Sequence, residues 1–188
     1  MKVILLSGWS TSGKDTVGKI LEKNYKASLF AFADVLKQIV ANEYQFPVAW
    51  TYTEQGKQTL LSNGKTVREV LIQRGQEIRK EKNDLGYFAR IVAQQIQTLS
   101  LMANPDQLVV ITDWRLPVEL ETLQTCLNSK IYKIRVQRAN LLESPIKDSE
   151  TETQLDTFAF DRIIMNNGIS LENLENEIKN QIKDILLE

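Results

Sequence analysis

Short runs of apolar residues recur along the chain and predict the strands of a sheet. The two clearest runs are residues 2–7 and 107–114, which are apolar almost throughout, as strands buried on both faces of a parallel sheet are. Further strands are expected at 28–32, 130–138 and 161–168, the last of which ends at a glycine. The pattern therefore predicts five strands.

Between these runs, apolar residues follow the three- and four-residue spacing of amphipathic helices. Helices are expected from Lys14 onward and over residues 33–44, 66–82, 85–102, 119–127 and 170–187. Strands that alternate with helices in this way indicate an α/β fold of three layers, in which a parallel sheet lies between helices on both faces. We expect a single domain over residues 1–188.

Two segments follow neither pattern. Residues 45–65 are mostly polar and contain proline and glycine, so a loop or a small hairpin is expected there. Residues 139–157 have no apolar period and carry five acidic side chains, which predicts a polar flap. We interpret this flap as a short lid over a binding site.

The stretch between the first strand and the first helix has the pattern of a phosphate-binding loop, with Gly8, four further residues, then Gly13 and Lys14. The backbone N–H groups of such a turn form a cradle for phosphate oxygens, and the lysine adds a positive charge. A chance match in an ordinary loop is the alternative, and the strand before and helix after the pattern argue against it. The nucleotide phosphates are expected to contact Gly8, Ser10, Thr11, Ser12, Gly13 and Lys14.

The position after Lys14 departs from this pattern, because Asp15 stands where a serine or threonine usually holds magnesium. A carboxylate there would repel phosphates unless it faces magnesium or accepts hydrogen bonds from the helix N-terminus as a cap. Thr16 retains a hydroxyl one position later. We therefore expect Asp15 and Thr16 to bind magnesium and ATP in a different arrangement from that of the common loop.

Asp113 is the third residue expected at the metal. It follows the apolar strand within 107–114, and parallel sheets place ligands at the carboxyl ends of their strands. An acidic residue in this position would bind magnesium, directly or through water, opposite Lys14. The alternative is that Asp113 caps the helix that follows it.

Composition narrows the class of protein. The chain has 188 residues, of which 43% are hydrophobic and 25% charged, as in globular proteins, and its net charge of −1 argues against binding to long nucleic acids. With Cys126 as the only cysteine and no histidine, an intramolecular disulfide and a Cys–His catalytic pair are excluded, and zinc chemistry is not expected. No segment approaches the ~20 apolar residues of a membrane span, and the N-terminal apolar run is too short for a signal peptide. We expect a cytoplasmic protein, in the host cytoplasm if it is viral.

Several segments resemble, in the same order along nearly the whole chain, the phage-type deoxynucleoside monophosphate kinases. After the loop sequence SGKDT, FADVLK at 32–37 is similar to the family's Phe-Ala-Asp-Pro-Leu-Lys segment, and 66–79 resembles its Thr-x-Arg-x-x-Leu-Gln-x-x-Gly stretch. TDWRLPVE at 112–119 resembles Asp-Val-Arg-Phe-Pro-Asn-Glu. Residues 151–168 resemble a Ser-Glu-x-x-Leu segment followed by Phe-Asp and Asn-Asn-Gly, although the histidine that usually precedes Ser-Glu in the family is missing.

The resemblance implies a three-layer P-loop NTPase fold and transfer of the terminal phosphate of ATP to a deoxynucleoside monophosphate. It also implies a helical acceptor-binding region over 34–104 and assigns Arg68 to the acceptor phosphate. Arg115, beside Asp113, is expected to contact a substrate phosphate. Asp34 and Lys37 follow the second strand and are expected to line the acceptor pocket. A solvated surface position is the alternative for Arg68 and Lys37.

The last expected site residues lie near the flap. Arg138 ends a predicted strand and is expected to contact the ATP phosphates or the transition state, whereas Arg135 is interpreted as facing the helix layer. Asn166 follows the last strand and is expected to meet the adenine edge, with a simple turn as the alternative. Arg79 lies in a charged run, RKEK, and is interpreted as solvated.

Two rival functions stay open at this point. One is a kinase of related architecture that phosphorylates another small phosphorylated metabolite. The other is a nucleotide-gated switch without catalysis, in which ATP orders the flap for a partner. The sequence does not identify the acceptor base, and it leaves a homodimer open.

Overall fold

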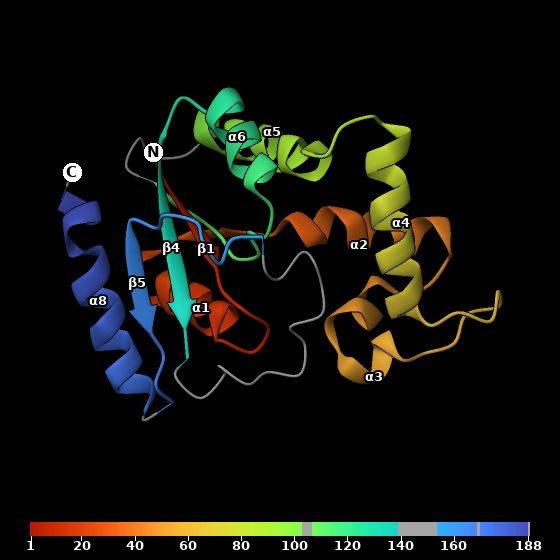
Figure 1. Ribbon diagram of the computed structural model, residues 1–188, viewed down its shortest axis with the longest axis horizontal. Coiled ribbons are helices and arrows are strands. Elements are labelled where there is room, and N and C mark those ends of the chain that lie inside the picture. Colours follow the sequence, from red (N-terminus) through yellow and green to blue (C-terminus); the bar gives the residue numbers. More distant parts are fainter. Residues whose placement is uncertain (103–106, 139–153, 169, 188) are drawn as a thin grey trace.

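Five parallel strands form one sheet in the order β2-β3-β1-β4-β5. The computed structural model describes residues 1–102, 107–138, 154–168 and 170–187. The strands are β1 (Lys2–Ser7), β2 (Ser28–Phe30), β3 (Leu108–Ile111), β4 (Lys130–Gln137) and β5 (Arg162–Met165). Strand β1 occupies the centre, paired with β3 on one side and β4 on the other (Figure 1).

Helices cover both faces of this sheet, because successive residues of a strand point to opposite faces. Ile4 and Leu6 of β1 pack with α1 (Lys14–Tyr25) and α8 (Leu171–Leu187). Val3 and Leu5 face the other way and pack with α5 (Tyr87–Met102) and α6 (Pro117–Cys126). All four side chains are fully buried. The expected three-layer α/β fold is confirmed.

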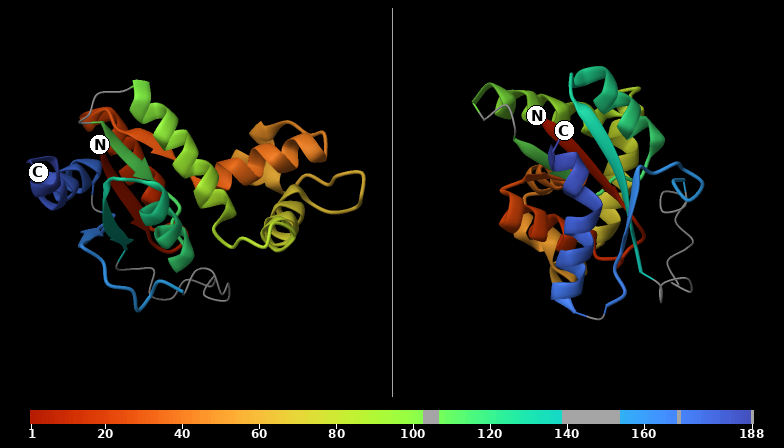
Figure 2. Two further views of the ribbon diagram at one scale, coloured as in Figure 1. Left: turned by 90° about the horizontal axis from the view of Figure 1, so that it is seen from above. Right: turned by 90° about the vertical axis from the view of Figure 1, so that its left-hand side faces the viewer.

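The remaining helices form an arm beside the sheet, which we define as residues 32–81. It consists of α2 (Phe32–Glu43), the short 3-10 helix η1 (Val48–Tyr52), α3 (Glu54–Lys57) and α4 (Val67–Glu81). Figure 2 shows the arm extending to one side of the sheet. It has a small apolar core of its own, made by Val40, Ala41, Phe46, Val67 and Val70. Helices α2 and α5 pack against each other and so join the arm to the sheet layer.

Several boundaries differ from the sequence predictions. The strand expected over 28–32 ends at Phe30, because Phe32 already begins α2. The segment 45–65, expected to be a loop or hairpin, contains η1 and α3. Most of the expected flap, residues 139–153, lies outside the described residues. Among the described residues, no helix combines the length and the apolar character that a membrane span requires.

Helix α4 begins with a capping box. The Glu69 backbone N–H donates to the Thr66 hydroxyl (3.2 Å), and the Thr66 backbone N–H donates to the Glu69 carboxylate (2.7 Å). These two bonds satisfy donors that the first helical turn would otherwise leave unpaired.

We expect Thr66→Ala to lower the free energy of unfolding by about 1 kcal/mol, because alanine cannot accept the cap hydrogen bond. Thr66→Ser retains the hydroxyl and should stay within a few tenths of a kcal/mol of the wild type. Urea unfolding at equilibrium measures both values. Equal midpoints for Thr66→Ala and Thr66→Ser would contradict the role of the cap.

Candidate functional site

The phosphate-binding loop connects β1 to α1 and needs glycine at two positions. Gly8 has φ 151° and Gly13 has φ 103°, a region that side-chain-bearing residues rarely adopt. A β-carbon on Gly8 would lie 2.4 Å from the carbonyl oxygen of Val136, and one on Gly13 would lie 2.3 Å from Nδ2 of Asn166. The backbone of β4 and the side chain of Asn166, which follows β5, therefore lie directly against the loop backbone.

Inside the loop, the polar groups suit an anion. Lys14 Nζ donates to the carbonyl oxygens of Gly8 (2.6 Å) and Trp9 (2.8 Å), so the ammonium group lies over the loop. Ser12 is 1% exposed, and its hydroxyl has no hydrogen-bond partner among the described residues. A buried hydroxyl in this state is rare in folded proteins. Together with the helix N-terminus behind it, the loop fits a phosphate.

Asp15 and Thr16 lie in the first turn of α1 and are both exposed. Their side chains are not occupied by a hydrogen bond or ion pair to any described residue. Within the described residues there is no group of three or more His, Cys, Asp or Glu side chains that could hold a metal. These two side chains fit magnesium bound in the usual way beside a nucleotide, with few protein ligands and the rest from phosphates and water.

Asn166 follows β5 and reaches the loop. Its side-chain amide donates to the carbonyl oxygen of Ser12 at 2.9 Å, while its backbone N–H donates to Gln137. The sequence analysis predicted that this side chain contacts the edge of an adenine. In the structure the amide instead holds the carbonyl that precedes Gly13, and so fixes the shape of the loop.

Asp113 comes directly after β3 and caps a helix distant in sequence. Its two carboxylate oxygens accept the backbone N–H groups of Phe32 and Ala33, each at 2.8 Å, at the start of α2. This cap arises because β2 pairs with β3 and α2 begins right after β2. Burial raises the pKa of Asp113 in spite of these two hydrogen bonds. The alternative prediction, in which Asp113 caps the helix that follows it, was wrong about the helix, because Asp113 caps α2.

Glu119 lies in the first turn of α6 and caps the start of this helix. The residue is 4% exposed, and one carboxylate oxygen accepts the backbone N–H groups of Arg115 and Leu116, both at 3.0 Å. Its burial, and then the charge of Asp113, raise the pKa of Glu119 to about 7, although the two backbone bonds and Arg79 act in the opposite direction. The sequence analysis gave this residue no role. The buried carboxylate fixes the turn that carries Arg115.

Arg79 corrects a sequence prediction, because it is not solvated. Its side chain is only 24% exposed, lies over the ring of Phe88 at 4.8 Å, and brings Nη2 to 3.8 Å from Glu119. Burial is the main cause that lowers the pKa of Arg79. The charged run RKEK suggested an exposed helix face, but the last turns of α4 pack against the sheet layer, where Ile78 joins the main core.

The structure brings together the expected acceptor residues Asp34 and Lys37 and adds Tyr52 to them. Asp34 accepts hydrogen bonds from Lys37 Nζ (2.7 Å) and from the Tyr52 hydroxyl (3.0 Å), and the ammonium group lies 4.1 Å from the centre of the Tyr52 ring. Burial first, and then the negative charge of Asp34, raise the pKa of Tyr52 to about 12. Sequence analysis missed Tyr52 because it lies in the segment expected to be irregular.

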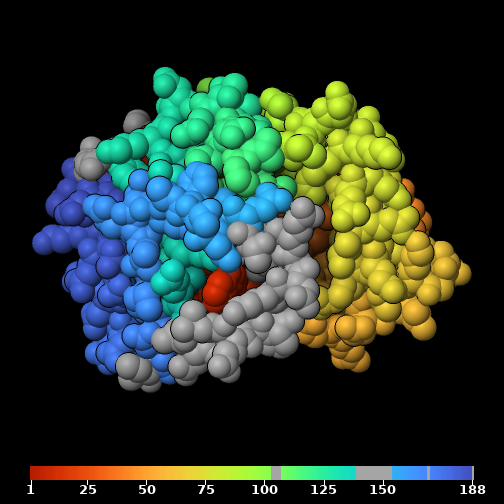
Figure 3. Space-filling model, viewed as in Figure 1, coloured from red at the N-terminus to blue at the C-terminus, as the bar shows by residue number. Residues whose placement is uncertain are grey.

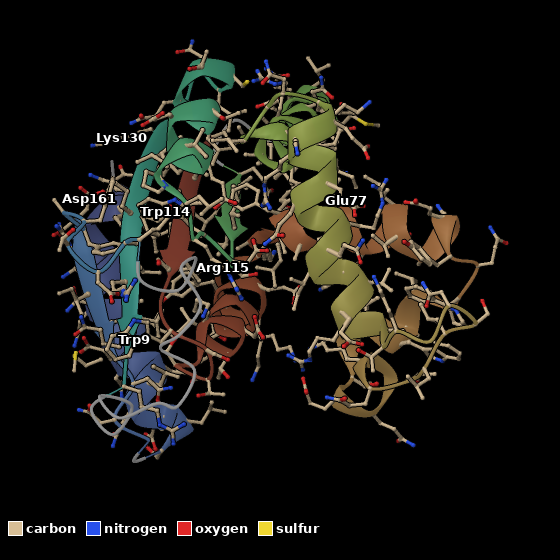
Figure 4. The ribbon with its side chains drawn as sticks, turned by 45° about the vertical axis from the view of Figure 1, so that its right-hand side comes forward. Trp9, Glu77, Trp114, Arg115, Lys130 and Asp161 are labelled. Carbon is tan, nitrogen blue, oxygen red and sulfur yellow. The ribbon has the colours of Figure 1, made fainter. Side chains whose placement is uncertain are left out.

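The other expected arginines come from three different places in the fold. Arg68, exposed in the first turn of α4, forms an ion pair with Glu54 at 2.5 Å. Arg138, exposed after β4, lies beside Gly168, whose added β-carbon would be 3.1 Å from Nη2. Arg115 is exposed, and Figure 4 shows it between the sheet and α4. Among the described residues, Arg68 and Arg138 thus have different neighbours, on the arm and after β5.

Arg135 connects the phosphate-binding loop to the segment that precedes β5. The residue is 5% exposed, and its guanidinium donates to the Ser7 hydroxyl (3.1 Å) and to Asp156 (2.6 Å). The Trp9 indole N–H donates to the same Asp156 carboxylate at 3.0 Å. The guanidinium also lies between the rings of Trp9 and Phe160. The sequence interpretation, in which Arg135 faces the helix layer, missed this network.

Figure 3 shows the face of the molecule between the blue and cyan C-terminal part and the yellow α4. Atoms of the N-terminal part of the chain, drawn in red, are exposed there. The carboxyl ends of β1 and β3, where ligands bind in parallel α/β sheets, thus open toward the arm.

Solved structures of three proteins described as kinases are similar to nearly the whole chain. Shikimate kinase from Aquifex aeolicus is 17% identical with a TM-score of 0.50, over 98% of each chain. The APS kinase of Mycobacterium tuberculosis in complex with AMPPNP and APS is 12% identical with a TM-score of 0.51, over 97% of each chain. A sugar kinase from a Janibacter species is 11% identical with a TM-score of 0.51, over 97% of this chain and 95% of that one.

At these identities the similarity shows a shared three-layer fold and nothing beyond the fold. No protein-family model matches the sequence, and no curated protein matches it either. The chemistry of the site therefore has to be argued from its own residues.

The buried carboxyl of Glu119 generates a prediction for stability as a function of pH. Between its ordinary value of 4.5 and about 7, the folded protein keeps a proton on this carboxyl that the unfolded chain has lost. Its contribution to stability is therefore fully present below pH 4.5 and is lost as pH rises to about 7. We expect the free energy of unfolding of the wild type, relative to Glu119→Gln, to fall across this window and to stay level above it. Chemical unfolding at a series of pH values measures the difference, and parallel curves would contradict it.

Proposed function

We propose that this chain is an ATP-dependent kinase that transfers the terminal phosphate to a deoxynucleoside monophosphate and releases the diphosphate. The observation that carries the proposal is the loop between β1 and α1, which combines a glycine backbone, the Lys14 ammonium group and a buried Ser12 hydroxyl that has no hydrogen-bond partner among the described residues. The shared fold with proteins described as kinases supports it, as does AMPPNP bound to one of them.

On the donor side, the loop would bind the ATP phosphates. Backbone N–H groups from Gly8 to Gly13 would donate to phosphate oxygens, including those of Ser10 and Thr11. Lys14, which now donates to two loop carbonyls, would exchange them for phosphate oxygens. Arg138 would supply a further positive charge beside the end of β4, and Asn166 would keep the loop in shape.

Asp15 and Thr16 would hold magnesium, whose charge neutralises the phosphates when the ion is bound with ATP. Both side chains are exposed at the head of α1, close to the loop. Asp113 uses one lone pair of each carboxylate oxygen for the α2 backbone. Its remaining lone pairs would accept hydrogen bonds from water at the metal.

On the acceptor side, the arm and the end of β3 supply charged side chains. We assign residues 34–104 to acceptor binding, with Arg68 and Lys37 on the arm and Arg115 after β3 as the basic contacts. Asp34 would orient Lys37. No general base is needed, because the phosphate of the acceptor is already ionised near neutral pH. The absence of histidine is consistent with this chemistry.

A kinase of another small phosphorylated metabolite is the second candidate. The comparisons support a small metabolite as the acceptor, because the three similar structures are described as kinases of shikimate, of APS and of a sugar. In that case the loop would act on ATP in the same way. The residues of the arm would then recognise a different acceptor.

The deciding experiment incubates the purified protein with ATP, magnesium and one acceptor at a time, and separates the products by anion-exchange chromatography. The panel contains the four deoxynucleoside monophosphates, the four ribonucleoside monophosphates, shikimate and APS. A diphosphate product from a deoxynucleotide supports the proposal. Phosphorylation of shikimate or APS alone supports the second candidate, and ATP binding without any product supports a nucleotide-gated switch.

Lys14→Ala should lower acceptor-dependent turnover by about 10²–10³-fold, because it removes a charge aimed at the transferred phosphate. Lys19→Ala is the matched control, since Lys19 is exposed on the same helix. Steady-state rates and circular dichroism of both variants are measured side by side. A folded Lys14→Ala protein with wild-type turnover would reject the assignment.

Asp15→Asn should raise the magnesium concentration that gives half the maximal rate, because an amide binds the ion more weakly than a carboxylate does. Asp15→Ser supplies the hydroxyl of the common loop and should recover part of the loss. Glu22→Gln removes an exposed carboxylate from the same helix and serves as the control. If both Asp15 variants titrate magnesium as the wild type does, Asp15 has no part in binding the ion.

A further inference from the structure

Two arginines of α4 differ in how their charge is satisfied. Arg74 donates to three carboxylates, those of Glu43 (3.0 Å), Glu77 (2.8 Å) and Glu81 (2.9 Å). Arg79, little more than one turn later, has no such set of partners. The ion pairs of Arg74 therefore link α2 to α4. A comparable set of ion pairs does not account for the partly buried charge of Arg79.

The hydrogen-bond donors of Arg79 are largely unused. Its buried Nε has no partner among the described residues, and Nη1 reaches only the Gly75 carbonyl, at 3.4 Å. Nη2 lies 3.8 Å from Glu119, which is too long for a hydrogen bond. A guanidinium has five N–H donors and keeps its charge in proteins. A half-buried arginine in this state has capacity to bind an anion.

The Glu119 carboxylate does not satisfy the hydrogen-bond donors of Arg79. Its other carboxylate oxygen is already engaged by the backbone N–H groups of Arg115 and Leu116. The two charges therefore attract each other across a gap, without the paired hydrogen bonds of a closed arginine–carboxylate contact. A second anion at Arg79 would be held by donors that the protein leaves unpaired.

The position of Arg79 indicates which anion this is. One carboxylate oxygen of Glu119 holds the turn that carries Arg115, and the other lies 3.8 Å from Nη2 of Arg79, so Arg79 of α4 lies beside the segment that follows β3, the neighbour of β1. Asp113 also lies near enough to act on the charge of Arg79. Ligands of parallel sheets bind at this edge. Arg68 lies eleven residues earlier on the same helix, about 16 Å away along the axis, so the two cannot hold one phosphate.

We propose that Arg79 binds the phosphate monoester of the acceptor together with Arg115, and that Arg68 contacts a more distant part of the acceptor. The inference rests on the proposed function and deepens it, because it names the residue that receives the acceptor phosphate. Glu119 is a positioning residue in this arrangement: it fixes the Arg115 turn, and its charge attracts Arg79 toward that turn.

The kinetic test compares Arg79→Gln, Arg79→Lys and Arg74→Gln, with the deoxynucleoside monophosphate that the wild type uses best. Arg79→Gln should raise the acceptor KM about 10- to 100-fold and leave the ATP KM unchanged, because charge-assisted bonds to the acceptor are lost. Arg79→Lys retains a charge and should recover part of the loss. Arg74→Gln should keep the acceptor KM within about twofold. Should Arg79→Gln not fold, the same KM shift in Arg79→Lys, smaller in size, decides the question.

A second measurement is independent of catalysis. Inorganic phosphate is titrated into ¹⁵N-labelled protein, and the arginine Nε–H resonances are followed by NMR, with Arg79 and Arg74 assigned by the loss of their signals in the variants. The Arg79 resonance should shift and saturate while that of Arg74 stays in place. A stationary Arg79 resonance, or an unchanged acceptor KM in a folded Arg79 variant, overturns the inference. If the wild type phosphorylates no deoxynucleotide but the Arg79 resonance shifts, the proposed function fails and the anion site stands.

Discussion

The site depends on the parallel pairing of β1 with β3 on one side and with β4 on the other. This register places the loop after β1 between the ends of its two neighbours. One neighbour leads to Asp113 and Arg115, and the other leads to Arg138. Because three strands end at the same edge, groups from distant parts of the sequence reach the loop without long connections. This arrangement explains why the loop has glycine at positions 8 and 13. The backbone of β4 and the Asn166 side chain occupy the space that a β-carbon would need there.

Two carboxylates, one partly buried and one buried, fix the backbone at this edge of the sheet. Asp113 accepts two backbone N–H groups of α2, and Glu119 accepts two from the turn that contains Arg115. Burial raises the pKa of both groups, so each fold contact is made in spite of the cost of desolvating a carboxylate. Backbone donors compensate part of this cost, because a carboxylate that accepts two N–H groups is stabilised in its charged form. The segment from Asp113 to Glu119 is thus held at both of its ends.

The sequence predicted what local patterns encode and missed what depends on contacts between elements. Strand and helix periods located the five strands and the faces of the main helices, because burial of one face is a local property. The end of β2 was placed two residues late, because Phe32 is apolar in a strand and in a helix alike. Arg79 and Arg135 were interpreted from their polar or alternating neighbours, yet Arg135 is buried and Arg79 is partly buried, with Glu119 of a later helix beside it. Asn166 was directed at a base because the turn pattern did not reveal how near β5 comes to the loop.

The acceptor side of the site is consequently organised around one short segment and a separate arm. Asp113 holds the start of α2, Glu119 faces Arg79 on α4, and Arg115 projects between them. In the proposed kinase, a group common to all acceptors, such as a phosphate, would be bound by this fixed segment together with Arg79, the arm residue that lies beside Glu119. Features that differ among acceptors would instead meet arm residues such as Tyr52. This residue lies outside the capped segment, donates a hydrogen bond to Asp34 and lies beside the Lys37 ammonium group. In the proposed kinase, changes in the arm at positions other than Arg79 would therefore alter the choice of acceptor while the geometry of phosphate binding stayed the same.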